Sequence, residues 1–194
     1  MTILRSARGL LHLINEVLDL SKIEAGKLTV EIEDFHIGEV VFDAISDVRL
    51  AAAANGTSLE VDMDDGDLML CSDQHRLSQC LRNLLSNAVK FTAEGQIRVR
   101  VWHDDDPRAP QVYLEVADTG IGMSPEQLSR VLSPFEQGDG SITRKFGGTG
   151  LGLTITQRIA RTLGGDIAIV SAPNAGTTVT LSVARNLTKL SSAA

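Results

Sequence analysis

The 194-residue sequence predicts an α+β fold, a two-layer sandwich with helices on one face of a mixed, largely antiparallel sheet. Strand and helix patterns are interleaved without the regular β-α alternation of a doubly wound parallel sheet. Most strand patterns alternate apolar and polar residues, as in 97–102 and 112–116, which indicates burial on one side only. A third observation, a leucine-striped segment near the N-terminus, predicts a helical stub ahead of the sandwich.

Residues 3–26 are expected to form this helical stub, with Gly26 as the stop. Its apolar stripe has the spacing of a short coiled-coil seam: Leu4, Ala7, Leu11, Ile14 and Leu18. A helix with such a stripe is marginal alone in water. We therefore expect it to pair with another helix or a second chain; the alternative is that it packs on its own domain.

The remaining elements follow from changes of periodicity along the chain. Alternation or short apolar runs predict strands at 28–35, 58–63, 68–71, 97–102, 112–116, 166–170 and 177–183. Helical spacing predicts helices at 37–54, 73–91, 125–132 and 149–163, with a glycine-bearing loop at 133–148. Asp73 stands where an N-cap belongs, at the start of the longest of these helices.

Composition excludes several classes of protein. With 18 Lys and Arg against 25 Asp and Glu, the formal net charge is −7, which excludes a general nucleic-acid binder. No apolar stretch approaches the roughly 18 residues of a membrane span, and no signal peptide opens the chain. Cys71 and Cys80 form neither a disulfide framework nor a metal site by themselves. These features predict a cytoplasmic protein without direct membrane insertion.

One face of the predicted helix 73–91 carries Asn83, Asn87 and Lys90, at i, i+4 and i+7. Asparagine is a poor helix former in the interior of a helix, so two on one face call for an explanation. An amide oxygen suits Mg²⁺, which keeps phosphate oxygens in its shell, and a lysine one turn later suits phosphate. A merely solvated helix face is the alternative.

A second set of polar residues ends the strand at 112–116. If the strand continues, Asp118 points to its apolar side, where an ionised carboxylate needs hydrogen bonds. The exocyclic amine of adenine is a suitable donor, and Gly120 and Gly122 would let the backbone approach a flat ring. Alternatively, Asp118 only caps a turn through its own backbone.

A cluster of glycines precedes the helix predicted at 149–163. Six of the 17 glycines fall within fifteen residues: Gly138, Gly140, Gly147, Gly148, Gly150 and Gly152. Glycines at a helix N-terminus present backbone N–H groups to an anion. The cluster matches neither a Walker A loop nor a dinucleotide fingerprint, so alone it predicts a flexible loop that suits phosphate.

Four motifs occur in order, and together they resemble the N, G1, F and G2 boxes of sensor histidine kinases. The residues are Asn83…Asn87…Lys90-Phe91-Thr92, Asp118-Thr119-Gly120-Ile121-Gly122, Pro134-Phe135-Glu136-Gln137 and Gly148-Thr149-Gly150-Leu151-Gly152-Leu153. Residues 13–27 look like the end of the second dimerisation helix of such kinases. The resemblance implies the Bergerat ATP-binding fold of the GHKL superfamily. It also implies three segments, 1–28 from dimerisation helix 2, 29–188 as the catalytic ATP-binding domain and 189–194 as a tail.

The resemblance also implies a site for Mg²⁺ and ATP. Asn87 would ligate the metal, with Asn83 beside it, and Asp118 would accept from the adenine amine. The implied nucleotide-binding set is Asn83, Asn87, Lys90, Phe91, Asp118, Gly120, Gly122, Met123, Phe135, Arg144, Lys145, Gly148, Thr149, Gly150, Leu151 and Gly152. Its implied catalytic members are Asn83, Lys90, Arg144 and Lys145, the last two lying in the ATP lid.

One departure from the family bears on activity. The family's phosphoacceptor is a histidine followed by Glu or Asp on the first dimerisation helix, and no histidine of this chain stands in such a helix motif. His12 is expected to be a packing or surface residue. The chain is therefore interpreted as a histidine-kinase catalytic domain that phosphorylates a histidine outside this sequence. Implied partners are histidine-bearing dimerisation helices, a response-regulator receiver domain and, in the full-length protein, a second copy.

Two alternatives to this interpretation stay open. Hydrolysing GHKL ATPases carry a glutamate near the position of Asn83 to activate water, and an amide cannot act as that base. A degenerate, nonenzymatic interaction module would not use ATP, but Asn87, Asp118 and the glycines are intact.

Overall fold

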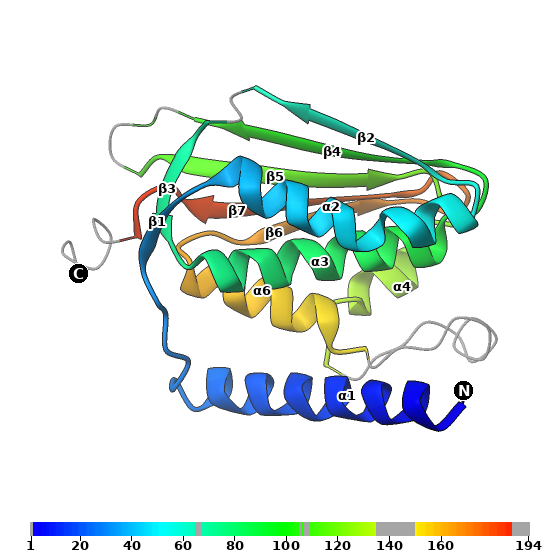
Figure 1. The fold of residues 1–194 in the computed structure, drawn as a ribbon, viewed down its shortest axis with the longest axis horizontal. Helices are drawn as coiled ribbons and strands as arrows, with labels where there is room; N and C mark the ends of the chain where they lie inside the picture. Colours follow the sequence, from blue (N-terminus) through cyan, green and yellow to red (C-terminus); the bar gives the residue numbers. More distant parts are fainter. Residues whose placement is uncertain (1, 65–66, 105, 107–108, 135–149, 188–194) are drawn as a thin grey trace.

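A five-stranded mixed sheet forms one layer of the protein (Figure 1). The computed structural model describes residues 2–64, 67–104, 106, 109–134 and 150–187, with the backbone alone at 2–9, 12, 16 and 24. In spatial order the strands are β2 (Ser58–Met63), β4 (Gln96–His103), β5 (Gln111–Asp118), β7 (Thr177–Ala184) and β6 (Ile167–Ser171). The pair β2–β4 is parallel and the other pairs are antiparallel. The predicted α+β sandwich is thus confirmed.

Helices cover one face of this sheet and form the second layer (Figure 1). They are α2 (Ile37–Ala54), α3 (Gln74–Phe91) and α6 (Gly152–Thr162), with the short α4 (Pro125–Arg130) beside them. Alternate residues of β4 and β5 point inward, and Ile97 and Leu114 are fully buried there. Leu81 and Leu85 of α3 belong to the same core cluster, so the apolar stripe of this helix covers the sheet.

A two-stranded antiparallel sheet lies at one end of the sandwich, formed by β1 (Glu33–His36) and β3 (Met69–Ser72). The predicted strand at 28–35 was therefore too long, because pairing begins only at Glu33, opposite Ser72. The Glu31 backbone N–H instead donates to Asp73 Oδ2 at 3.0 Å. A side chain thus satisfies the backbone where a ladder was expected.

Helix ends follow local chemistry. Asp73 is the predicted N-cap of α3, and its Oδ1 accepts from the Arg76 backbone N–H at 2.8 Å. Helix α6 begins at Gly152, where the prediction began at Thr149, and Gly150 just before it has a φ of +73°. No helix within the described ranges is long and apolar enough to cross a membrane.

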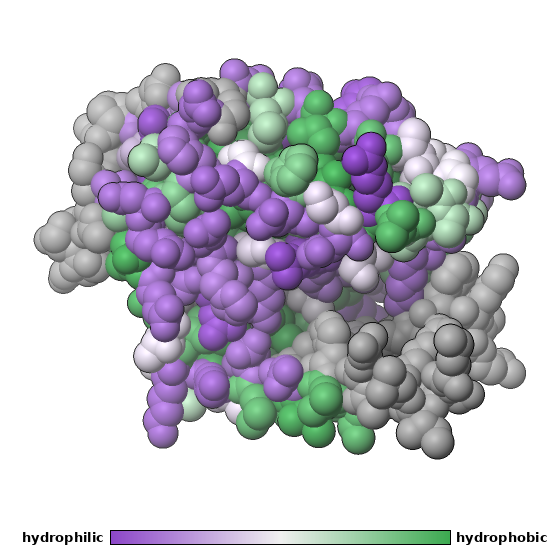
Figure 2. Space-filling model, in the orientation of Figure 1, coloured by the Kyte–Doolittle hydropathy of each residue, from purple (hydrophilic) through white to green (hydrophobic). Residues whose placement is uncertain are grey.

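Helix α1 (Thr2–Glu24) lies on the far side of the helical layer from the sheet (Figure 1). It ends at Glu24, and the predicted stop, Gly26, follows with a φ of +63°. Leu20 is buried near its end, and Asp19 contacts Arg76 and Gln79 of α3. The seam residues Leu11, Ile14 and Leu18 are 60%, 44% and 51% exposed, and an apolar patch runs along this edge of the surface (Figure 2).

Candidate functional site

The polar face of α3 carries the predicted residues Asn83, Asn87 and Lys90, all half-buried. The neighbouring residues Leu84 and Leu85 are buried in the core. Packing of that apolar stripe therefore fixes the rotation of α3 and holds the amides and the lysine on one outward line.

Asn83 is held by the first turns of α6. Its Nδ2 donates to Thr156 Oγ1 at 2.8 Å, and its Oδ1 accepts from Asn87 Nδ2 at 3.5 Å. A Cβ added at Gly152 would collide with the Asn83 side-chain amide. The structure thus brings together the predicted Asn83 and Gly152, which are 69 residues apart in the chain.

Lys90 and Phe91 close the C-terminal end of α3. The Lys90 ammonium lies 4.6 Å from the centroid of the Phe91 ring. Burial lowers the pKa of Lys90 below its ordinary value. A partly dehydrated ammonium gains from an anion, and phosphate is such an anion.

Asp118 ends β5 with its side chain in phase with Val112, Leu114 and Val116, as predicted. Burial raises the pKa of Asp118, while hydrogen bonds from the backbone N–H groups of Gly120 and Thr177 work in the opposite direction. The Gly120 N–H donates to Asp118 Oδ1 at 2.8 Å. The carboxylate therefore caps its own turn and is also partly desolvated, and its role as the acceptor for the adenine amine stays a prediction.

The turn after Asp118 packs against the end of α3. The Ile121 N–H donates to the Phe91 carbonyl oxygen at 3.2 Å, and a Cβ at Gly120 would collide with that same oxygen. Gly122 has a φ of +62°, and a Cβ there would collide with the Ala172 carbonyl. Both glycines are required for the close approach of backbone to backbone.

The other predicted residues divide into two groups. The Met123 N–H donates to Ser171 Oγ at 2.9 Å, which ties the end of the turn to β6. Leu151 is 1% exposed and belongs to the core, so its contact with a nucleotide stays a prediction. Five predicted residues lie outside the described part of the chain: Phe135, Arg144, Lys145, Gly148 and Thr149.

Sequence reasoning missed Thr156 at the site, and it included Thr92 in the N-box motif without assigning it a role. Thr156 holds Asn83, and its place one turn after Gly152 on α6 was the available signal. Thr92 follows Lys90-Phe91 directly, and its hydroxyl lowers the pKa of Asp118. Thr92 Oγ1 is buried and makes no hydrogen bond of ordinary geometry within the described ranges. The buried Thr92 hydroxyl, which lacks such a hydrogen bond, and the Asp118 carboxylate beside it together suit a polar ligand group such as an amine.

The donor set suits a hard cation carried with phosphates. Among the described residues no group of three His, Cys, Asp or Glu side chains is placed to hold a metal. Asn87 Oδ1, however, makes no hydrogen bond to a described residue, because the contact with Asn83 uses its Nδ2. One neutral protein oxygen with ligand oxygens and water is a coordination typical of Mg²⁺.

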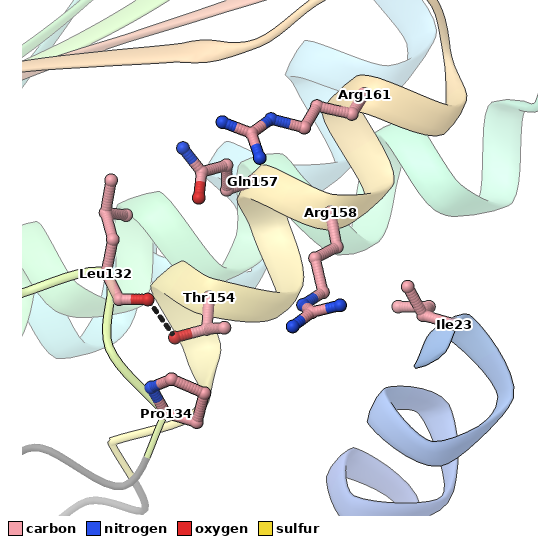
Figure 3. Close-up of a pocket in the computed structure, with 7 residues that line it drawn as sticks. All are labelled: Ile23, Leu132, Pro134, Thr154, Gln157, Arg158 and Arg161. Atoms are coloured by element: carbon pink, nitrogen blue, oxygen red, sulfur yellow. Dashed lines mark hydrogen bonds between the residues drawn. The ribbon is translucent and has the colours of Figure 1, made fainter. Parts of the chain in front are cut away.

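A separate cavity of about 350 Å³ lies between α1 and α6 (Figure 3). Ile23 of α1 faces Arg158 across the cavity. At the other end of the cavity, the Thr154 hydroxyl donates a hydrogen bond to the Leu132 carbonyl oxygen. Its lining includes none of the predicted site residues. We therefore place the site at the junction of α3, the turn after β5 and the start of α6.

The fold is that of a known ATPase family. Residues 72–187 match the family described as histidine kinase-, DNA gyrase B-, and HSP90-like ATPase, and the chain belongs to it. Sensor protein GacS of Pseudomonas syringae pv. syringae is 42% identical over 179 residues, which are 90% of this chain and 20% of GacS. The signal transduction histidine-protein kinase BarA of Escherichia coli K12 is 40% identical over 185 residues, 91% of this chain and 20% of BarA.

Solved structures agree on the fold. The crystal structure of full-length ShkA in complex with AMPPNP covers 92% of this chain and 36% of the ShkA chain, with a TM-score of 0.80 and 26% identity. The Acinetobacter baumannii histidine kinase AdeS gives a TM-score of 0.76 at 22% identity. The chain spans about one fifth of the length of GacS and BarA, the curated relatives that it matches.

Proposed function

We propose that this chain is the catalytic ATP-binding domain of a two-component histidine kinase. It binds ATP with Mg²⁺ and transfers the γ-phosphate to a histidine on a dimerisation helix outside these 194 residues. The observation that carries the proposal is the meeting of the amide face of α3 with the Asp118 turn and the start of α6. The relative BarA is named a signal transduction histidine-protein kinase, which supports the histidine-kinase chemistry, and the response-regulator partner that the resemblance implies is part of the same proposal.

Each end of the site has a chemical task in this proposal. Asp118, with Thr92 beside it, accepts from the adenine amine, and the Gly120 N–H that donates to Asp118 Oδ1 holds the carboxylate in place. At the other end Lys90 neutralises phosphate charge, and Asn87 offers its Oδ1 to Mg²⁺. Bound Mg²⁺ supplies charge neutralisation and geometry to the phosphates, so the protein's contribution is largely positioning.

Asn83 favours transfer over hydrolysis. An amide takes no proton from water, and Asn83 is already engaged through both its nitrogen and its oxygen. We therefore expect the chain with γ-labelled ATP to release little phosphate and not to label itself. A steady release of phosphate, at the ~1 s⁻¹ of a working enzyme, would favour the hydrolysing ATPase. Self-labelling that is lost in His12→Ala would instead identify His12 as an acceptor.

Nucleotide binding is the first test. ATP with MgCl₂ at about 100-fold above its Kd should raise the melting temperature of the wild type by roughly 5 °C or more. Asp118→Ala and Asn87→Ala should lose most of this shift, because they remove the adenine acceptor and the metal ligand. The matched control is Asp62→Ala on the exposed edge strand β2, which should keep the full shift. No shift in the wild type would contradict every ATP-using function.

A further inference from the structure

Thr156 is the buried partner of the amide line on α3. Its side chain is 2% exposed, and its Oγ1 accepts from Asn83 Nδ2 at 2.8 Å. Thr156 is buried where α6 packs on α3, so its side chain cannot contact a ligand that binds from the solvent side. Any effect that it has on the nucleotide must therefore pass through Asn83.

The direction of these hydrogen bonds determines which atom of Asn87 faces outward. With Asn83 Nδ2 on Thr156, Asn83 Oδ1 is left to accept from Asn87 Nδ2. Asn87 Oδ1 is then the atom that is left for a metal. If the Asn83 amide turned over, its NH₂ group would oppose the NH₂ group of Asn87, and Asn87 would have to turn as well.

The backbone around Thr156 is held in place as well. Cys80 Sγ, one turn before Asn83 on α3, donates to the Thr156 carbonyl oxygen at 3.9 Å. Gly152, one turn before Thr156 on α6, packs against the Asn83 amide with no room for a Cβ. The Thr156 hydroxyl therefore has a fixed position relative to Asn83. A residue that orients the neighbour of a metal ligand must be fixed in this way.

We propose that Thr156 is a positioning residue of the magnesium–nucleotide site. Its hydroxyl anchors the Asn83 amide, whose Oδ1 accepts from Asn87 Nδ2, so that Asn87 Oδ1 would be left to ligate a bound metal. The inference rests on the proposed function, and it adds a residue on α6 that controls the metal dependence of nucleotide binding. Its signature is a loss of the affinity that Mg²⁺ adds, with the affinity for metal-free nucleotide unchanged.

The test measures AMPPNP affinity by calorimetry, once with MgCl₂ and once with EDTA. Thr156→Val keeps the shape and removes the hydroxyl, and we expect it to reduce the Mg²⁺-dependent gain in affinity about 10-fold. In EDTA its affinity should stay within about twofold of the wild type. Thr156→Ser retains the hydroxyl and should restore the gain.

The control is Thr154→Val on the same helix. Thr154 is 3% exposed and its hydroxyl donates to the Leu132 carbonyl at 3.0 Å, so its loss is a comparable change in buried chemistry away from Asn83. It should keep the Mg²⁺-dependent gain. An undiminished gain in Thr156→Val, or equal weakening with and without Mg²⁺, overturns the inference alone. Absence of AMPPNP binding in the wild type overturns the proposed function with it.

A second measurement needs no nucleotide, and it tests the inference even if the Thr156→Val variant folds poorly. The side-chain amide resonance of Asn83, assigned by its loss in Asn83→Asp, should shift in Thr156→Ala and stay in place in Thr156→Ser. An Asn83 resonance that is unmoved in Thr156→Ala would show that the hydroxyl does not orient the amide, and the inference would fall.

Discussion

Asp118 is a single residue that is both the proposed ligand acceptor and a group whose pKa makes the stability of the fold depend on pH. Burial raises its pKa above the ordinary value of 3.8, so the folded protein holds this proton more tightly than the unfolded chain does. Between the two pKa values folding takes up a proton, and stability must fall as pH rises. The contribution of this group is thus present at acid pH and is lost as pH rises through the folded pKa.

Asp118→Asn removes the carboxyl group and with it this pH-dependent contribution to stability. The free energy of unfolding of the variant relative to the wild type should increase as pH rises from ~4 to ~7. Urea titrations at several pH values measure the difference. Asp62→Asn on the exposed edge of β2 is the control, and its difference should vary less. A difference for Asp118→Asn that is constant with pH would contradict the prediction.

Gly122 and Gly26 form a second test at this scale, because they share a backbone conformation and differ in surroundings. Their φ values are +62° and +63°, but a Cβ at Gly26 meets nothing within 4 Å, whereas one at Gly122 collides with the Ala172 carbonyl. Gly26→Ala should therefore cost only the left-handed backbone penalty, about 1 kcal/mol. Gly122→Ala should cost roughly 3 kcal/mol or more, because the turn must also move.

Thermal or urea unfolding of the two alanine variants measures that difference directly. The close approach at Gly122 also holds the turn that carries Asp118, so Gly122→Ala should weaken nucleotide binding while Gly26→Ala leaves it intact. Equal losses of stability in the two variants would show that the turn has room that the structure does not give it.

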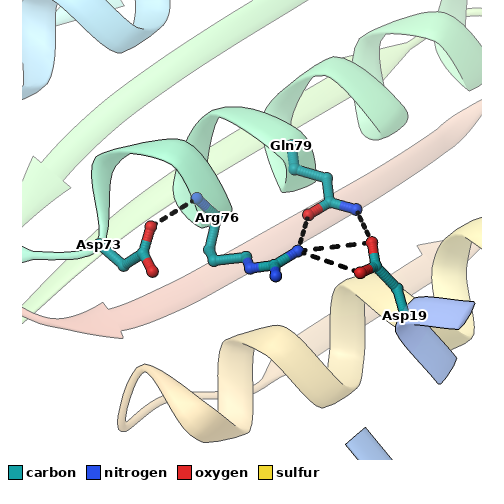
Figure 4. Close-up of polar contacts among 4 residues, drawn as sticks. All are labelled: Asp19, Asp73, Arg76 and Gln79. Carbon is teal, nitrogen blue, oxygen red and sulfur yellow. Dashed lines mark hydrogen bonds and ion pairs between the residues drawn. The ribbon is translucent and has the colours of Figure 1, made fainter. Parts of the chain in front are cut away.

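At the scale of elements, the join between α1 and α3 is a small polar cluster (Figure 4). Arg76 Nη1 lies 3.4 Å from both oxygens of Asp19 and donates to Gln79 Oε1 at 2.9 Å, and Gln79 Nε2 donates to Asp19 Oδ2 at 2.9 Å. The charged side chains are 16% and 18% exposed. Burial and the shared glutamine make this an ordered pair that should hold the end of α1 in place.

A double-mutant cycle tests that contribution. Asp19→Ala and Arg76→Ala should show a coupling of about 1–2 kcal/mol in the free energy of unfolding. The control is Asp47 with Arg82, a shorter contact of 3.0 Å whose side chains are 53% and 52% exposed. Its coupling should stay below about 0.5 kcal/mol, because water screens an exposed pair. A larger coupling for the exposed pair would contradict the importance of burial.

The helices and strands also show which parts of the fold could be predicted from the sequence. Strong periodicity predicted α2 and α3 nearly to the residue, because apolar stripes on a helix leave few alternatives. Residues 28–32 have the alternation of a strand and form none, because a ladder needs a partner strand and Asp73 takes the Glu31 N–H. Thr156 was missed at the site for a related reason. Its partner Asn83 is 73 residues away, and only the packing of α6 on α3 brings them together.

For the molecule as a whole, the main apolar surface feature is the outer face of α1. Figure 2 shows apolar side chains gathered along the edge that this helix forms, opposite the sheet layer. Leu11, Ile14 and Leu18 are 60%, 44% and 51% exposed, and they lie on the seam that the sequence predicted. Contacts with α6 and α3 use the other side of α1, so packing on its own domain leaves the seam open.

We therefore expect the chain to self-associate through α1, with a dimer Kd in the ~µM range because a single helix from each chain buries little area. Sedimentation velocity over about 1–100 µM should show a rising average mass. Ile14→Ser combined with Leu18→Ser should remain a monomer throughout, since it removes two central apolar contacts. Leu50→Ser, 85% exposed on α2, changes an apolar residue outside the seam and should leave association intact. Association unchanged by the α1 double substitution, or abolished by Leu50→Ser, would place the contact elsewhere on the molecule.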